Sequence, residues 1–135
     1  MAKPIFGSGF NLKPSSVIRV VVDISPDARR FTIDLGIGGP DIALHFNPRF
    51  NYLRSHNVIV FNTFQNGNFG EELRESHFPF QKGNKAEIFI MFDSNFFLVR
   101  LPDGFEYNFP NRTKATVINY VGIHGDVTIR TLAFE

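Results

Sequence analysis

Cysteine and tryptophan are both absent from this chain of 135 residues. Without cysteine there are no disulfides, no thiolate metal sites and no thiol chemistry, so the fold can stand in either redox compartment. No segment approaches the apolar length that a membrane-spanning helix needs, so membrane insertion is not expected. Charges of the two signs balance, with 14 Lys and Arg against 13 Asp and Glu. That balance excludes the basic stripe of a nucleic-acid-binding protein.

Signatures of catalysis and metal binding are also missing. The chain contains no GxSxG, P-loop or HExxH pattern. The four histidines, at positions 45, 56, 77 and 124, lack metal-ligand spacing, and no cofactor is expected. Glu71 and Glu72 are adjacent, so on a strand they would face opposite ways and cannot form a glycosidase pair. We therefore expect no enzyme, although a site assembled only in three dimensions stays open.

The first residues, Met1 to Gly7, lack the apolar run of a secretory signal. We expect the chain to be cytoplasmic when made. On that expectation the formal glycosylation sequon at Asn111 stays unused. The composition, 43% hydrophobic and 20% charged, is that of a globular protein, and the length predicts one domain over residues 1–135.

Short alternating apolar runs separated by turn residues dominate the chain, and 17 phenylalanines supply much of the predicted core. Asn66-Gly67 and Pro102-Asp103-Gly104 are hairpin signals. About ten strands at this spacing predict an all-β protein, an antiparallel sandwich or barrel. The expected strands cover 17–24, 31–35, 42–47, 58–62, 69–74, 87–93, 96–101, 105–109, 118–124 and 127–133.

Polar side chains recur at alternate positions within one predicted strand, at His45, Asn47 and Arg49. Alternate side chains of a strand share a face, so imidazole, amide and guanidinium groups form a row about 13 Å long at roughly 3.3 Å per residue. Glu72 and Arg74 share a face in the same way. A polyhydroxylated ligand such as a sugar needs this kind of surface, because the polar row offers fixed hydrogen-bond donors and acceptors without a nucleophile.

Each of these residues also has a structural reading when it is taken alone. His45 could be a structural histidine, Arg49 could cap a strand edge, and Asn62 could hold a turn. Glu72 and Arg74 could be an exposed ion pair worth about 1 kcal/mol or less. Taken together they favour binding, because Arg49 and Arg74 can each fork to a carboxylate, and Glu72 between them could hold both guanidinium planes still for ligand hydroxyls.

The motifs around this row resemble the carbohydrate-recognition signature of the galectins. The resemblance rests on several residue types at matched spacing and covers essentially the whole chain, as in a prototype galectin with one domain. In its lack of cysteine the chain is also similar to the fish galectins called congerins. The residues that carry the resemblance are His45 to Phe50, Asn62, Gly70, Glu72, Arg74, Phe78 to Gln81 and Phe109 to Arg112.

The resemblance implies a jelly-roll β-sandwich of two antiparallel sheets and a lectin that binds β-galactosides without catalysis, cofactor or metal. It implies that His45, Asn47 and Arg49 contact the axial galactose 4-hydroxyl and that Asn62 contacts the 6-hydroxyl. Glu72 and Arg74 would reach the next sugar and orient Arg49. Its partners would be glycans of glycoproteins or glycolipids, reached by non-classical secretion to the extracellular space.

Phe69 departs from the family pattern, because galectins usually carry tryptophan at this position. The smaller phenylalanine face should weaken stacking on galactose by about 0.5–1.5 kcal/mol, which is up to about tenfold in affinity. The ring could also fill a gap in a closed loop. Leu53 likewise stands where some prototype members have a histidine that touches the sugar.

These departures leave two alternatives to a galactose-specific lectin. One is a lectin of shifted preference, for example toward mannose-containing or extended glycans. The other is a structural protein that keeps the fold and has lost sugar binding. A quaternary state also follows from the resemblance: cross-linking needs two sites, so a homodimer is expected, with edges near Ile5 to Phe10 and Val127 to Phe134 as the pairing strands.

Overall fold

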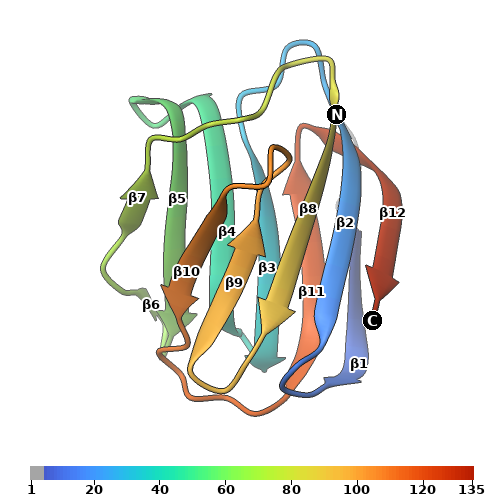
Figure 1. Ribbon diagram of the computed structural model, residues 1–135. Helices are drawn as coiled ribbons and strands as arrows, with labels where there is room; N and C mark the ends of the chain where they lie inside the picture. Colours follow the sequence, from blue (N-terminus) through green and yellow to red (C-terminus); the bar gives the residue numbers. More distant parts are fainter. Residues whose placement is uncertain (1–4) are drawn as a thin grey trace.

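Two antiparallel sheets pack face to face in the computed structural model, which describes residues 5–135 (Figure 1). The expectation that Met1 to Gly7 do not form a secretory signal falls partly on residues 1–4, which lie outside the described residues. The strands are β1 (Ile5–Leu12), β2 (Val17–Ile24), β3 (Phe31–Gly38), β4 (Asp41–Tyr52), β5 (Ser55–Gln65), β6 (Asn68–Phe69), β7 (Leu73–Glu75), β8 (Lys85–Phe92), β9 (Phe96–Arg100), β10 (Glu106–Pro110), β11 (Ile118–Gly125) and β12 (Val127–Phe134).

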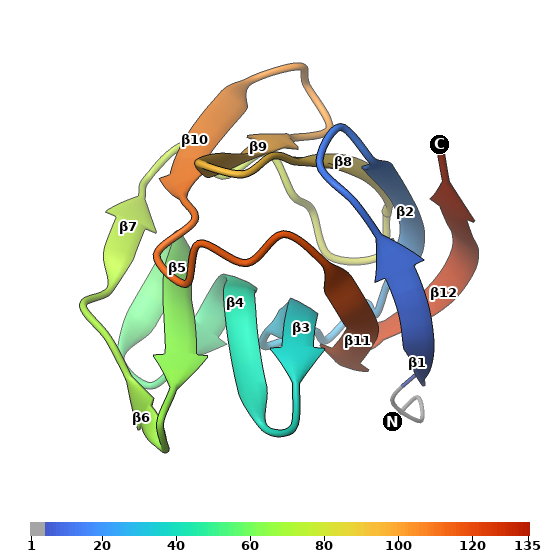
Figure 2. The ribbon, with the colours of Figure 1, turned by 90° about the horizontal axis from the view of Figure 1, so that it is seen from below.

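The larger sheet has seven strands in the order β1-β11-β3-β4-β5-β6, with β7 also paired to β5. The smaller sheet has five strands in the order β10-β9-β8-β2-β12. All pairings are antiparallel, and the view from below in Figure 2 shows the two layers, with β1 and β12 at one side of the molecule. The predicted all-β, two-sheet sandwich is confirmed. β1 and β12 are each the outermost strand of a sheet, as expected.

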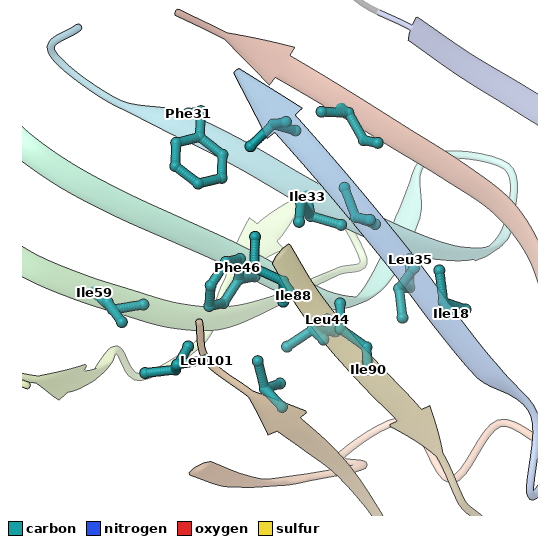
Figure 3. Packing of buried hydrophobic residues seen from close by; sticks show 14 of the residues in the cluster. Ile18, Phe31, Ile33, Leu35, Leu44, Phe46, Ile59, Ile88, Ile90 and Leu101 are labelled. Carbon is teal, nitrogen blue, oxygen red and sulfur yellow. The ribbon is translucent and has the colours of Figure 1, made fainter. Parts of the chain in front are cut away.

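The core lies between the sheets and is built from the apolar members of each alternating run. Phe31, Ile33 and Phe46 of the larger sheet meet Ile88 and Ile90 of the smaller one, as Figure 3 shows, and all five are fully buried. Because successive side chains of a strand alternate, burying Ile33 and Phe46 turns their neighbours to the outer face of the larger sheet. The core therefore decides which polar groups the outer face presents.

The hairpin predicted at Asn66-Gly67 links β5 to β6. Both residues have positive φ, at 55° and 81°. A two-residue turn that matches strand twist needs left-handed backbone at both central positions, which asparagine and glycine tolerate best. This turn folds β6 back against β5, with Phe69 opposite Phe64.

The single strand predicted over residues 69–74 is wrong in its continuity. The chain pairs with β5 at Phe69 and again from Leu73 to Glu75, and residues 70–72 leave the ladder between them. Arg112 donates to the carbonyl of Glu71 at 2.7 Å, so a side chain takes the place of a strand partner there. Together with β1, this division raises the strand number above the ten or so expected.

Candidate functional site

A cavity of about 420 Å³ opens on the outer face of the larger sheet. Its residues come from β3, β4, β6 and β11 and from the turns beside them. The lining residues are Arg30, Thr32, Asp34, His45, Asn47, Arg49, Tyr52, Leu53, Phe69 and His124. The outer face thus gathers the residues of the predicted polar row with Phe69 in one open hollow.

Strand register explains why these side chains converge. Asp34 of β3 lies opposite His45 of β4, and His45 lies opposite Asn62 of β5. In the neighbouring row, Asn47 lies opposite Val60, which in turn lies opposite Arg74 of β7. Directly opposed residues of an antiparallel ladder share a face. Polar groups from four strands are therefore brought together by pairing alone.

The row at 45, 47 and 49 is fixed by hydrogen bonds before any ligand arrives. His45 Nδ1 and Asp34 Oδ1 are 2.6 Å apart. Asn47 Nδ2 donates to the Phe31 carbonyl at 2.8 Å, and Arg49 Nε donates to Asn47 Oδ1 at 2.8 Å. Each side chain is thus oriented by its neighbour, which lowers the entropy lost on binding.

The Asp34 carboxylate decides which imidazole nitrogen of His45 remains free. A carboxylate partner favours a proton on Nδ1, because the hydrogen bond made by one ring nitrogen sets the state of the other. Nε2 is then left for a ligand. The His45 side chain keeps 17% of its surface exposed and Asp34 keeps 11%, so the pair is largely shielded from water.

Arg49 is a mostly buried cation, with 8% of its surface exposed. Burial lowers the pKa of its guanidinium, and the Glu72 carboxylate acts in the opposite direction. The group nevertheless remains charged, because an arginine in a protein is effectively always protonated. Its Cζ lies 5.4 Å from the Tyr52 ring centroid, and Arg30 Cζ lies 4.9 Å from the same centroid.

The expected bridge from Glu72 to both arginines forms only in part. Glu72 Oε1 accepts hydrogen bonds from Arg74 Nη2 at 2.8 Å and Nε at 3.1 Å. Arg49 and Arg74 instead share the hydroxyl of Ser55, at 3.3 Å and 3.0 Å from their Nη1 atoms. Ser55 is buried beside both guanidinium groups, whereas Glu72 is exposed. The residue that joins the two arginines is therefore Ser55, which the sequence patterns did not indicate.

Phe69 stands at the wall of the cavity and is open to solvent, with 54% of its surface exposed. Its ring centroid lies 5.1 Å from the His45 ring and 4.9 Å from the Phe64 ring. Phe64 supports one edge of the ring while the rest stays accessible. The ring does not fill a gap in a closed loop, so the closed-loop reading is not what the structure shows.

Asn62, Glu72 and Arg74 lie beside the cavity but are not among the residues that line it. Asn62 keeps only 3% of its surface exposed. Its Nδ2 donates to the Gly70 carbonyl at 2.9 Å, and its Oδ1 accepts from the Thr63 amide at 2.7 Å and from Arg112 at 3.2 Å. Asn62 of β5 therefore links Gly70, the residue after β6, to Arg112.

Sequence patterns missed several residues of the cavity. Asp34 and Thr32 alternate with the core residues Phe31 and Ile33, and the same alternation that selected His45 would have placed them on the outer face. His124 lies opposite Thr32 in the ladder, a pairing that only the topology reveals.

Within residues 5–135, no group of histidines and carboxylates could hold a metal ion. Nor does that part of the chain contain a helix long and apolar enough to cross a bilayer.

Comparisons with known proteins identify the family of this chain. The family model of the galactoside-binding lectins matches residues 8–134. This match covers nearly every strand of the sandwich. The chain belongs to the galactoside-binding lectin family.

Relatives of this lectin match it end to end. It is 43% identical to galectin-1 of the sheep Ovis aries and to galectin-1 of the mouse Mus musculus, over all of each chain. Among solved structures, the chicken-liver agglutinin CG-16 matches with a TM-score of 0.94 and 34% identity, over 98% of this chain and 100% of that one. An ancestral congerin matches with a TM-score of 0.94 and 31% identity, over 97% and 99%. The expected galectin membership is confirmed.

Proposed function

We propose that this lectin binds the terminal galactose of β-galactosides in the cavity beside Phe69, as one carbohydrate-recognition domain over residues 1–135. The observation that carries the proposal is a preorganised row of His45, Asn47 and Arg49 next to an open aromatic ring, on a member of the galactoside-binding lectin family. The axial 4-hydroxyl of galactose meets this row. His45 Nε2, the nitrogen turned away from Asp34, and the guanidinium of Arg49 are its partners.

The apolar C–H face of galactose lies on the Phe69 ring. Carbohydrate rings have such a face, and an exposed aromatic ring gains by covering it. Asn62 contributes to the 6-hydroxyl through the second N–H of its amide, since one N–H is already given to Gly70. Arg74, held by Glu72 and Ser55, donates to the following sugar. No side chain in this set acts as a nucleophile, and the proposed activity is binding without catalysis.

A glycan array compared between the native protein and Arg49→Ala tests this specificity. We expect signal on lactose-type and N-acetyllactosamine-type glycans, and its loss in the variant, because Arg49 joins Asn47 to Ser55. Arg100→Ala is the matched control, since Arg100 pairs with Glu106 on the smaller sheet, away from the β1 and β12 edges. Signal confined to mannose-containing glycans, or no signal above background, would contradict the proposal.

The partners that this function implies are glycans of glycoproteins and glycolipids, and a second copy of the chain. The similar chicken-liver agglutinin is homodimeric. β1 and β12 leave one edge each unpaired in the sandwich, and the ring centroids of Phe10 and Phe134 lie 4.9 Å apart across them. We propose that these edges form the dimer and that two sites then cross-link glycans. Sedimentation at micromolar concentration tests the state.

We further propose that the lectin is made in the cytosol and reaches extracellular glycans without the classical secretory route. Asn111, the residue of the glycosylation sequon, keeps only 5% of its surface exposed. Its Nδ2 donates to the carbonyls of Ser94 and Ala115 at 3.0 Å each, so a glycan on that nitrogen would replace one of the two N–H donors and break at least one of these hydrogen bonds. Secretion that stops when vesicle traffic from the endoplasmic reticulum is blocked would contradict this route.

A further inference from the structure

Arg112 connects the smaller sheet to the sugar-binding face of the larger one. It follows β10 by two residues, yet its guanidinium reaches across to the segment between β6 and β7. Nη2 donates to the Glu71 carbonyl at 2.7 Å, and Nη1 donates to Asn62 Oδ1 at 3.2 Å. Neither the cavity lining nor the sugar contacts proposed above include Arg112.

The guanidinium of this side chain is held in place. Arg112 Cζ lies 5.0 Å from the ring centroid of Phe109, which is fully buried. The preceding residue, Asn111, is itself tied to Ser94 and Ala115. A guanidinium stacked on a buried ring gains a cation–π contact and loses freedom. Arg112 therefore presents two donors from a rigid base.

Arg112 fixes the orientation of the Asn62 amide. Asn62 Oδ1 accepts from both the Thr63 amide and Arg112, so the oxygen side of the amide is fully occupied. The Nδ2 side must then face the Gly70 carbonyl, to which it donates. Without Arg112, Asn62 Oδ1 accepts only from the Thr63 amide, and the orientation of the Asn62 amide is less strongly fixed.

Gly70 is held from three directions at the point where the chain leaves β6. Its amide donates to the Thr63 carbonyl at 3.0 Å, and its carbonyl accepts from Asn62. A Cβ added at Gly70 would lie 3.1 Å from Arg112 Nη1. Arg112 therefore closes directly over this backbone. Phe69 precedes Gly70, and β6 is only two residues long, so these contacts decide where the ring stands.

We propose that Arg112 is a positioning residue for galactoside binding and acts through the Phe69 ring. This inference rests on the proposed function. Arg112 holds residues 70–71, and through them the aromatic platform, in the orientation that the sugar requires. Its role differs from general support of the fold, because its two side-chain hydrogen bonds end on Asn62 and on the loop between β6 and β7.

A single tryptophan introduced at position 69 tests this directly, because the chain contains none of its own. In Phe69→Trp the only indole reports both lactose binding and the mobility of the platform. We compare Phe69→Trp alone with its combinations with Arg112→Ala, Arg112→Lys and Arg100→Ala. Arg100 is the matched control, since it pairs with Glu106 on the smaller sheet.

Adding Arg112→Ala should lower the fluorescence anisotropy of the introduced indole and weaken lactose binding about fivefold to tenfold, the scale of a lost charge-assisted hydrogen bond. Arg112→Lys should recover part of both, because an ammonium keeps the charge and N–H donors but lacks the planar fork that reaches both acceptors. If Arg112→Ala does not fold, Arg112→Lys alone tests the proposal. Arg100→Ala should change neither quantity.

The outcomes separate this inference from the proposed function. If Phe69→Trp itself gives no response to lactose, the proposed function fails. If it responds, and the Arg112 variants keep its anisotropy and lactose midpoint, only the positioning role is overturned. Weaker binding with unchanged indole anisotropy would also overturn it, because Arg112 would then act by a route other than the platform.

Discussion

In the proposed site, single residues should set how strongly the cavity holds a sugar, and Phe69 is the clearest case. The ring is half exposed and supported by Phe64, so a larger ring can be accommodated outward. Phe69→Trp should tighten lactose binding by up to about tenfold, since stacking gains about 0.5–1.5 kcal/mol from the larger face. Isothermal titration measures the difference. An unchanged affinity would show that the ring does not stack on the sugar.

Asp34 provides a second prediction at this scale, through its contact with His45 Nδ1. Asp34→Ala frees the imidazole to rotate and change tautomer, and lactose binding should weaken about tenfold, equivalent to about 1.4 kcal/mol. Asp34→Asn keeps an acceptor for Nδ1–H and should retain most of the affinity. Equal affinity in Asp34→Ala and the native protein would contradict a positioning role for this carboxylate.

At the scale of strands, the end of β11 depends on a close backbone approach. Gly125 has a φ of 103°, and a Cβ there would lie 2.7 Å from both the Arg30 carbonyl oxygen and the Phe31 Cα. Gly104 also has positive φ, 90°, but a Cβ there meets nothing within 4 Å. Gly125→Ala should destabilise the fold by about 3 kcal/mol and Gly104→Ala by about 1 kcal/mol.

Thermal melting distinguishes the two glycine variants, because the second carries backbone strain without an overlap. On this size of domain the losses correspond to roughly 12 °C and roughly 4 °C in melting temperature. Equal losses would mean that the overlap beside β3 is relieved by a backbone shift.

The free edges of β1 and β12 lead to a prediction about assembly. Phe134 is 37% exposed, and its ring centroid lies 4.9 Å from that of Phe10 where the two edge strands meet. Phe134→Glu should shift a dimer to monomer in sedimentation at micromolar concentration, because a carboxylate is costly to bury in an interface. Phe105→Glu is the control, since Phe105 is 38% exposed but lies between β9 and β10. If the native protein sediments as a monomer, the proposal that these edges form a dimer interface is wrong.

At the scale of the whole molecule, alternation accounts for most of what the sequence predicts. The strand expected over residues 17–24 has these bounds as β2, whereas the cleanly alternating run at 31–35 continues to Gly38 as β3. The polar row also falls on one face, because its apolar neighbours are buried. Local patterns of this kind need no knowledge of the tertiary fold.

Features that depend on distant contacts could not be predicted. Residues 70–72 lie inside the run expected as one strand, but Asn62 and Arg112 hydrogen-bond the carbonyls of Gly70 and Glu71, and these residues leave the ladder. Ser55 gains its role only because the turn after β4 brings it beside both arginines. The partnership of His124 with the cavity likewise follows from the pairing of β11 with β3. Sequence spacing holds no signal for such neighbours.

The central claim is that the cavity of this lectin recognises the axial 4-hydroxyl of a terminal galactose. Lactose and cellobiose are matched ligands for it, since they differ only in the orientation of that hydroxyl. Nuclear magnetic resonance titration at the same concentrations should give chemical-shift changes at His45, Asn62 and Arg74 with lactose and none with cellobiose. Equal changes with both sugars, or no change with lactose at high concentration, would contradict the account.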